Sequence, residues 1–413
     1  MRIAMAFQFR LKLTKEQEAQ CTQIAGCCRF VWNRALALKK EAWERERKSV
    51  SRFELDALLV QWKKEFPWLA EAPSQALQQV NKDLDQAFQN FFRRCKTGET
   101  PGYPRFKKKG IHDAFRFPQG IRLLPDISGR MGAVSLPKLG PLKFRHTREI
   151  QGTIQNATVS RQAGAWHISF SCKDVPISPR IERSETVGID RGIAAFAALS
   201  DGTLVKGPEP GRKSAHRLAK LQRNLSRKEK FSQNWKKTKA KIQRLHSHTA
   251  RVRKDFLQKL STEIVKNHAV VVVEELKVRN MTRSAKGTKE EPGTHVRAKS
   301  GLNRAILDQG WSAFEGMLAY KLAWRAGALV KVKPHYTSQT CSACGDCRAE
   351  NRLTQEAFRC QLCGYEAHAD LNAAQNILAA GHVAKACGGD PIGDLTKQEA
   401  YRTKVISNHT SSG

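Results

Sequence analysis

Two pairs of cysteines in the C-terminal third of the chain constrain its fold more than any other feature. Cys341 and Cys344 form one CxxC knuckle, and Cys360 and Cys363 form a second. Four thiolates at this spacing can meet tetrahedrally around one Zn²⁺, and the glycine after each pair lets the backbone turn beneath the metal. Such a closed site is structural and not catalytic. The sequence therefore predicts one structural zinc, for which Cys347 is a spare thiol that can compete as a ligand.

The chain is strongly basic. Its 413 residues include 72 Lys and Arg against 38 Asp and Glu, which gives a net charge of +34. An excess of this size favours a polyanionic partner, above all nucleic acid, over a surface that is charged only for solubility.

Three features indicate the interior of a cell. No apolar run is long enough to cross a membrane, and the N-terminus lacks the apolar segment of a signal peptide. The six cysteines outside residues 341–363 are scattered, as buried thiols of a reducing compartment are. We expect a cytoplasmic protein with no membrane partner, associated with the nucleoid when bound to DNA.

The first half of the chain changes pattern twice. Residues 1–13 alternate as a strand does, and residues 114–180 carry short alternating strands broken by Gly and Pro. These two segments together predict a small β-barrel. Residues 14–113 are mainly helical in pattern and begin at a capping box at Thr14, so they are predicted to be a helical insertion.

The second half alternates between strands and helices. We expect a hairpin over residues 186–206, a basic helical stretch over roughly 213–266 and a long helix from about 304 to 326. Residues 282–301 are polar and Gly-rich, which predicts a loop, and residues 381–413 have the pattern of a flexible tail.

Two basic segments are candidates for nucleic-acid contacts. In residues 97–112, aromatic and basic side chains alternate among prolines and glycines, which suits stacking on bases and gripping of phosphates. In residues 212–254, almost no acid interrupts a basic helical face. The alternative in both cases is an ordinary solvated surface. The candidate contacts are Tyr103, Arg105, Phe106, Lys107, Lys108, Lys109, Arg223, Arg227, Lys236 and Lys237.

Three acids far apart in the chain lie in settings that suit a divalent metal. Asp190 lies in an apolar strand-like run, Glu274 ends a run of valines, and Asp370 begins a helical stretch directly after the cysteines. A buried carboxylate is costly unless it is compensated, and convergence on a pair of Mg²⁺ ions would compensate all three. That arrangement cuts phosphodiesters. Taken singly, each acid has an ordinary alternative, such as a turn acid, Glu275 in place of Glu274, or a helix N-terminal residue.

The order of these features resembles TnpB, the family of transposon-encoded RNA-guided endonucleases ancestral to type V CRISPR effectors. The likeness runs over nearly the whole chain and is most specific over residues 336–341 (YTSQTC) and 368–374 (HADLNAA). Arg191 departs from the pattern, because many relatives have an apolar residue there. On a strand it would point away from the face that carries Asp190.

The resemblance implies a multidomain α+β protein. It implies a wedge β-barrel from residues 1–13 and 114–180, a helical recognition domain at 14–113, an RNase H-like (RuvC) α/β nuclease domain at 181–335 and 367–380, a zinc-ribbon insert that binds target nucleic acid at 336–366, and the tail at 381–413.

The resemblance also implies an activity. A family member binds a guide RNA from the transposon end, recognises a short target-adjacent motif and cleaves double-stranded DNA by Mg²⁺-dependent phosphodiester hydrolysis. Asp190 is expected to bridge both Mg²⁺ ions, while Glu274 and Asp370 each help to hold one. Because base pairing with the RNA reads the sequence, the protein needs a basic channel and little base readout. We expect a monomer on one RNA.

Three other functions stay open at this stage. The first is a miniature type V CRISPR effector, which shares the chemistry and takes its guide from an array. The second is a non-cleaving RNA-guided DNA-binding repressor, whose mark would be a missing acid. The third is a plain zinc-ribbon RNA-binding protein, which would leave Asp190, Glu274 and Asp370 unexplained.

Overall fold

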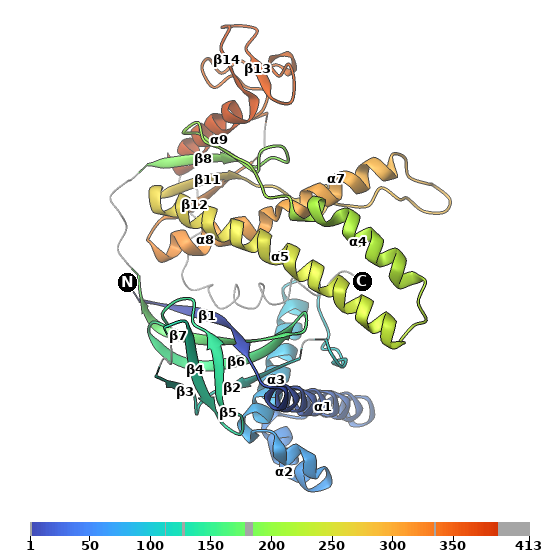
Figure 1. The fold of residues 1–413 in the computed structure, drawn as a ribbon. Helices are drawn as coiled ribbons and strands as arrows, with labels where there is room; N and C mark the ends of the chain where they lie inside the picture. Colours follow the sequence, from blue (N-terminus) through green and yellow to red (C-terminus); the bar gives the residue numbers. More distant parts are fainter. Residues whose placement is uncertain (1, 112, 126–128, 178–184, 334–335, 387–413) are drawn as a thin grey trace. The chain divides into compact units, whose positions relative to one another are not determined.

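The structure is a computed structural model that describes residues 2–111, 113–125, 129–177, 185–333 and 336–386. The chain divides into two compact units, Met1–Pro176 and Ile177–Gly413 (Figure 1). No helix among the described residues is long and apolar enough to cross a membrane.

A seven-stranded antiparallel sheet lies in unit 1. Its strands are β1 (Arg2–Lys12), β2 (Ala114–Phe117), β3 (Arg122–Leu124), β4 (Met131–Leu136), β5 (Gly140–Arg145), β6 (Thr153–Gln162) and β7 (Ala165–Pro176). Their spatial order is β2-β6-β7-β1-β5-β4-β3, so the N-terminal strand lies in the middle. The alternation along β1 is confirmed, because Phe7 and Phe9 are buried and the Phe9 ring lies 5.0 Å from that of Phe144.

The sheet is open. β2 and β3 are its two edges, and no pairing joins them within the part of the chain that the structure describes. The predicted closure of residues 1–13 and 114–180 into a barrel is therefore wrong, although both segments form strands. Alternation predicts only that one face of a strand is buried, and an open sheet meets that condition too. Closure depends on how the edge strands match, which no local pattern encodes.

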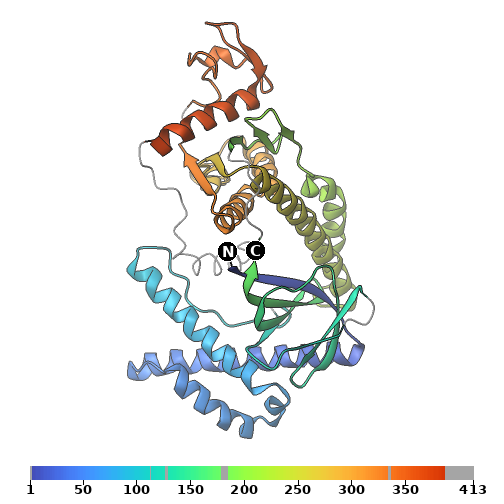
Figure 2. The same cartoon turned by 90° about the vertical axis from the view of Figure 1, so that its left-hand side faces the viewer.

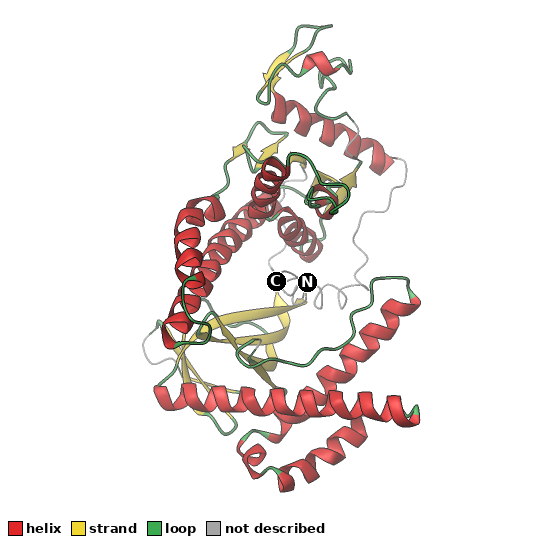
Figure 3. Ribbon diagram, turned by 90° about the vertical axis from the view of Figure 1, so that its right-hand side faces the viewer, coloured by secondary structure: helices red, strands yellow, loops and turns green. Residues whose placement is uncertain are grey.

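Helices are inserted between β1 and β2. They are α1 (Lys15–Glu46), α2 (Arg52–Glu65), the short 3-10 helix η1 (Pro67–Glu71) and α3 (Ser74–Lys96). The capping box at Thr14 is confirmed: the Gln17 amide donates to the Thr14 hydroxyl at 3.2 Å, and the Thr14 amide donates to the Gln17 side chain at 3.1 Å. α1 and α3 pack against each other and against β2 (Figure 3).

Unit 2 contains a mixed five-stranded sheet. Its strands are β8 (Thr186–Asp190), β9 (Ala197–Leu199), β10 (Leu204–Val205), β11 (Val270–Glu274) and β12 (Ala328–Val332). The spatial order is β10-β9-β8-β11-β12; β10, β9 and β8 are antiparallel, whereas β8, β11 and β12 are parallel. The segment predicted as one hairpin therefore holds three strands.

Helices cover both faces of this sheet (Figure 2). In β11, the side chains of Val271 and Val273 belong to one core with α5 (Gln233–Asn267) and α8 (Trp311–Trp324). Val272 packs on the opposite face with Ile377 of α9 (Ala369–Ala386). Side chains of a strand alternate between its faces, so each position in β8 and β11 can be assigned to the α5/α8 face or to the α9 face.

Two predicted helices are each divided in two. The basic stretch forms α4 (Pro210–Ser226) and α5, joined by a turn, and the long helix forms α7 (Val296–Gln309) and α8. α7 ends because Gly310 has a left-handed φ of 75°, which glycine adopts without strain. The predicted loop at 282–301 is shorter than expected. It begins after α6 (Val278–Met281), as predicted, but it ends where α7 begins at Val296. α9 continues through residues 381–386, and the rest of the predicted tail lies outside the described residues.

Candidate functional site

Two of the three acids end neighbouring parallel strands. Ile189 of β8 pairs with Val273 of β11. The next residue of each strand, Asp190 and Glu274, therefore ends its strand beside the other. Both side chains lie on the α9 face, because Ile189 and Val273 point into the core with α5 and α8. The strand register therefore brings two carboxylates 84 positions apart in the sequence to one edge of the sheet.

The third acid reaches the same edge from a helix. Asp370 lies in the first turn of α9, which packs across β8. The packing is close, since a Cβ at Gly188 would meet the backbone oxygen of Ala374. Asp370 Oδ2 lies 3.8 Å from where a Cβ would stand at Gly192, two residues after Asp190. The absence of a side chain at Gly188 leaves room for α9 to bring its acid against the end of β8.

The electrostatics agree with this arrangement. Burial is the main cause that raises the pKa of Asp190 to about 7, and the negative charges of Glu274 and then Asp370 raise it further. Burial also raises the pKa of Asp370, against the nearby positive charges of His368 and Arg352. A bound cation would offset the repulsion among these partly buried carboxylates and favour their charged forms.

The three acids are spread more widely than the ligands of a single small ion. Within the described parts of the chain, one set of at least three potential ligands has all its ligand atoms within 4.8 Å of one another, and that set is the four cysteines. At least one pair among the carboxylates of Asp190, Glu274 and Asp370 is therefore farther apart than this.

Neighbouring side chains hold Glu274 in place. The Thr337 hydroxyl donates to its carboxylate, and the Arg191 guanidinium donates to its backbone carbonyl. Arg191 itself is buried on the other face of the sheet, where Nη1 lies 3.0 Å from Glu315 of α8. Lys331 pairs with the same Glu315 at 2.5 Å. As predicted, Arg191 points away from Asp190. From the opposite face of the sheet it donates to the backbone of Glu274.

Arg352 is a residue that the sequence alone did not single out. Its Nη2 lies 3.5 Å from Oδ1 of Asp370, and the Arg352 side chain is 29% exposed. It comes from the segment between the two cysteine pairs, so only the folded structure shows that it faces the acids. It places a cation beside Asp370.

The four predicted zinc ligands converge. Sγ of Cys341 lies 3.8 Å from that of Cys363, and Sγ of Cys344 lies 3.6 Å from that of Cys360. A tetrahedron with Zn–S bonds of about 2.3 Å has sulfur–sulfur edges of about 3.8 Å. The cluster is thus compatible with one zinc ion, and Cys347 is not part of it. The described cysteines are all free of disulfides, as expected.

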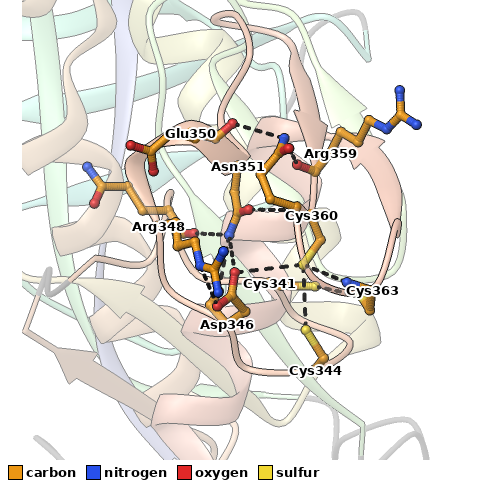
Figure 4. A network of polar contacts seen from close by, with 11 residues as sticks. Cys341, Cys344, Asp346, Arg348, Glu350, Asn351, Arg359, Cys360 and Cys363 are labelled. Atoms are coloured by element: carbon orange, nitrogen blue, oxygen red, sulfur yellow. Dashed lines mark hydrogen bonds and ion pairs between the residues drawn. The ribbon is translucent and has the colours of Figure 1, made fainter.

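A shell of hydrogen bonds surrounds the cysteines (Figure 4). The buried Asn351 donates to the Asp346 carboxylate at 3.1 Å and accepts from the Gln361 amide at 2.8 Å. The amide of Cys363 donates to Sγ of Cys360 at 3.5 Å, and hydrogen bonding of this kind lowers the pKa of Cys360 to about 7. A lowered pKa favours the thiolate, the form that binds metal, at Cys360. Hydrogen bonds among the sulfurs raise the pKa of Cys344 to about 12 and also raise that of Cys363, so the metal-free cluster favours one thiolate.

The cysteine lobe is fastened to the helix that carries Asp370. This lobe spans residues 336–368 and includes η2 (Ala349–Asn351), β13 (Ala357–Arg359) and β14 (Glu366–His368). Asn372 of α9 accepts from the Ser342 amide at 2.9 Å and donates to the Thr340 carbonyl at 2.8 Å. Asn376 donates to the same Thr340 carbonyl at 2.6 Å. The four-cysteine cluster therefore buttresses the start of α9.

Known proteins share this combination of features. Residues 167–285 match the family OrfB_IS605, described as "Probable transposase", residues 311–377 match "Cas12f1-like, TNB domain", and residues 1–48 match "Helix-turn-helix domain". "Putative RNA-guided DNA endonuclease InsQ" of Escherichia coli strain K12 is 49% identical over 390 residues, which are 94% of this chain and 95% of that protein. The chain belongs to the TnpB family.

Further comparisons agree with membership in the TnpB family. "Putative RNA-guided DNA endonuclease" of Streptomyces pristinaespiralis is 37% identical over 410 residues, with 97% of this chain and 94% of that protein covered. A solved Cas12f1 in a complex with sgRNA and target DNA has a TM-score of 0.54 over 91% of this chain and 98% of its own, at 14% identity. That last likeness shows the fold alone.

One family description differs from the local structure of this TnpB-family chain. The segment matched as a helix-turn-helix domain, residues 1–48, contains the strand β1 and the single 32-residue helix α1. No turn divides α1.

The first candidate nucleic-acid segment of the TnpB-family chain is partly built into unit 1. Lys107 lies with Nζ 3.9 Å from the centre of the Trp32 ring, and burial lowers the pKa of Lys107. Tyr103 packs edge-on against Phe88 at 5.5 Å. These two residues fix the loop, while the side chains of Arg105, Phe106, Lys108 and Lys109 are exposed.

The second candidate segment is the pair of helices α4 and α5. Arg223 and Arg227 lie at the end of α4, Lys236 and Lys237 lie in the first turns of α5, and all four side chains are exposed. The turn between the two helices therefore gathers the predicted basic contacts.

Proposed function

We propose that this TnpB-family chain is an RNA-guided DNA endonuclease that cleaves double-stranded DNA by Mg²⁺-dependent phosphodiester hydrolysis. One observation carries the proposal: Asp190, Glu274 and Asp370 meet at one edge of the sheet in unit 2. Relatives of matching length bear the name of RNA-guided DNA endonucleases, which supports the same activity here.

The topology of unit 2 supports an RNase H-like (RuvC) nuclease domain over residues 181–335 and 367–380. Three antiparallel strands are followed by two parallel ones, with helices on both faces and the acids at the ends of the first strand and the fourth. The cysteine lobe is inserted between β12 and α9. We assign to residues 336–366 of this lobe contacts with the target nucleic acid.

The acids suit Mg²⁺. Carboxylate oxygens are the ligands this ion prefers, and a pair of ions would offset the repulsion that raises the pKa of Asp190. The charges of Glu274 and Asp370 both act on Asp190, so Asp190 would be the residue shared by the ions, and Glu274 and Asp370 would help to hold them. When bound, the pair supplies an activated water and stabilises the leaving oxygen.

Other side chains prepare this edge for a nucleic-acid backbone. Thr337 and Arg191 fix the carboxylate and the main chain of Glu274, so the acid is oriented before substrate arrives. Arg352 pairs with Asp370, and its guanidinium can also donate hydrogen bonds to a phosphate of the substrate. The burial of Asp190 limits the access of water to its carboxylate.

The rest of the chain fits a guide RNA and a duplex target. Base pairing reads the target, and the protein contributes backbone contacts, which the net charge of +34 supplies. In unit 1, the helices inserted between β1 and β2 are our candidates for the recognition of a target-adjacent motif. We expect one protein monomer on each guide RNA.

Plasmid cleavage tests the proposal. The purified chain with its guide RNA should cut a matching plasmid in Mg²⁺ and leave it intact without the ion. Asp190→Ala should reduce cutting to background while the RNA still binds. Glu274→Ala and Glu275→Ala form a matched pair, because Glu275 is the exposed neighbour on the same strand end. Undiminished cutting by Asp190→Ala, or equal loss in the Glu274 and Glu275 variants, would exclude this site.

A further inference from the structure

Two aromatic side chains meet where α4 turns into α5: Phe231 in the turn and the half-buried Trp235 in the first turn of α5. The two helices lie side by side as a hairpin that extends away from the sheet of unit 2, and residues 227–232 form its tip (Figure 1). The Phe231 side chain is 72% exposed, and its ring centre lies 5.4 Å from that of Trp235. This pair is used neither by the core of unit 2 nor by the acidic site.

The backbone holds Phe231 in an unusual conformation. Its φ of 69° is left-handed, a region that bulky residues rarely occupy. The turn is well fastened around it, since the Ser232 amide donates to the Glu229 carbonyl at 3.3 Å and the Ser232 hydroxyl caps α5 by accepting from the Trp235 amide at 3.2 Å. A rigid turn therefore keeps a large apolar ring in solvent, against the tendency of such rings to be buried.

The surroundings of the ring pair are almost purely basic. Residues 211–254 contain 16 Lys or Arg and one acid, Glu229. Lys239 lies with Nζ 4.8 Å from the centre of the Trp235 ring. Exposed Lys236 and Lys237 follow Trp235 directly. Flat aromatic faces among cations match the two parts of a single-stranded nucleic acid, whose bases stack and whose phosphates pair.

We propose that Phe231 and Trp235 form a stacking platform for unpaired bases of the guide RNA. Bases of a duplex are stacked within it and offer no free face, whereas loops and ends of a folded RNA offer splayed bases at all times. Target DNA is single-stranded only while the duplex is open, so RNA is the ligand that suits a permanently displayed platform. The inference rests on the proposed function in one respect, that the RNA is the guide.

A salt titration of RNA affinity tests the platform. The probe is the RNA that co-purifies with the wild-type full-length chain, removed from the protein and bound again. The double variant Phe231→Ala/Trp235→Ala should bind about 10- to 100-fold more weakly at every salt concentration, because stacking is lost without loss of charge. Lys236→Ala/Lys237→Ala should instead reduce the slope of log affinity against log salt by about 1–2.

Matched variants separate stacking from disruption of the turn. Phe231→Tyr and Trp235→Phe keep a flat ring and should bind as the wild type does. Leu307→Ala is the control for an exposed apolar side chain elsewhere, since Leu307 of α7 is 57% exposed and lies outside the basic turn. It should leave affinity unchanged.

The outcomes separate this inference from the proposed function. If the wild type cuts plasmid and the double Ala variant keeps full affinity, the platform is overturned and the nuclease function stands. If the wild type does not cut but the double Ala variant loses affinity while the Tyr and Phe variants keep it, the platform stands as an RNA-binding device and the nuclease function fails.

Discussion

Asp190 and Glu274 end adjacent parallel strands at the same level and face the same helix, α9. Apolar packing does not favour a charged carboxylate at either position. Burial and mutual repulsion raise the pKa of Asp190 to about 7, so the metal-free fold is under electrostatic strain at this edge. The account of function depends on that strain being relieved by bound cations.

The strain predicts a gain of stability on neutralising Asp190. The folded chain holds the Asp190 proton more tightly than the unfolded chain, because the pKa is raised from 3.8 to about 7. The contribution of protonated Asp190 to the stability of the fold is therefore fully present below about pH 4 and is lost as the pH rises through about 7. Without added Mg²⁺, Asp190→Asn should stabilise the fold by about 4 kcal/mol at pH 8 and by almost nothing at pH 4.

Thermal unfolding at the two pH values checks this prediction. The variant should unfold several degrees above the wild type at pH 8, and the difference should vanish at pH 4. A variant that is less stable than the wild type at pH 8 would show that the Asp190 charge is already compensated in the metal-free chain.

Zinc content distinguishes the four ligands from the spare thiol. Cys344→Ser removes one of four converging sulfurs and should lower the bound zinc well below one per chain, whereas Cys347→Ser should leave one. Both side chains are exposed, so neither change disturbs a core. Because Asn372 of α9 donates to the Thr340 carbonyl and accepts from the Ser342 amide, the lobe is tied to α9, and Cys344→Ser should also weaken DNA cleavage. Equal zinc in the two variants, by mass spectrometry of metals, would contradict this ligand set.

Close packing of α9 on β8 predicts that Gly188 cannot be changed. A Cβ at Gly188 would lie 2.7 Å from the amide nitrogen of Leu378 and closer still to the Ala374 carbonyl, both backbone atoms. Gly188→Ala should push α9 away, move Asp370 off the shared edge and abolish cleavage. Gly301→Ala is the control: a Cβ there meets nothing within 4 Å, and a helical Gly→Ala change should stabilise by up to about 1 kcal/mol. Full cleavage by Gly188→Ala would show that the position of α9 does not matter.

Arg191 supports the site from the opposite face of the sheet. Arg191→Ala should destabilise the fold by about 3 kcal/mol, because Glu315 loses one buried partner and keeps only Lys331. Loss of its hydrogen bond to the Glu274 carbonyl should also raise the Mg²⁺ concentration needed for half-maximal cleavage. Arg304→Ala, at an exposed position on α7, should change neither quantity. An Arg191 variant with unchanged stability would mean that the ion pair contributes nothing.

The local features of this fold were readable from the sequence. The valine run at 270–273 and the apolar residues around Asp190 predict strands, and Thr14 predicts the start of α1, because each depends on neighbours in the sequence. The CxxC spacing predicts the converging sulfurs for the same reason. A resemblance to TnpB added the overall order of domains.

Features that depend on distant pairing were missed. The barrel predicted from residues 1–13 and 114–180 is an open sheet, since closure is decided by edge strands that no local pattern relates. The break at Gly310 was also missed, because an isolated glycine in a helical pattern is often tolerated. Arg352 reaches Asp370 only through the fold of the cysteine lobe.

The most direct test of the account is the anomalous scattering of Mn²⁺ in crystals of the chain, with Mn²⁺ in place of Mg²⁺. We expect two peaks about 3.5–4 Å apart, with Asp190 touching both ions and Glu274 and Asp370 touching one each. No peak at this edge, or a single peak that touches one acid alone, would contradict the claim that the three carboxylates form one two-metal centre.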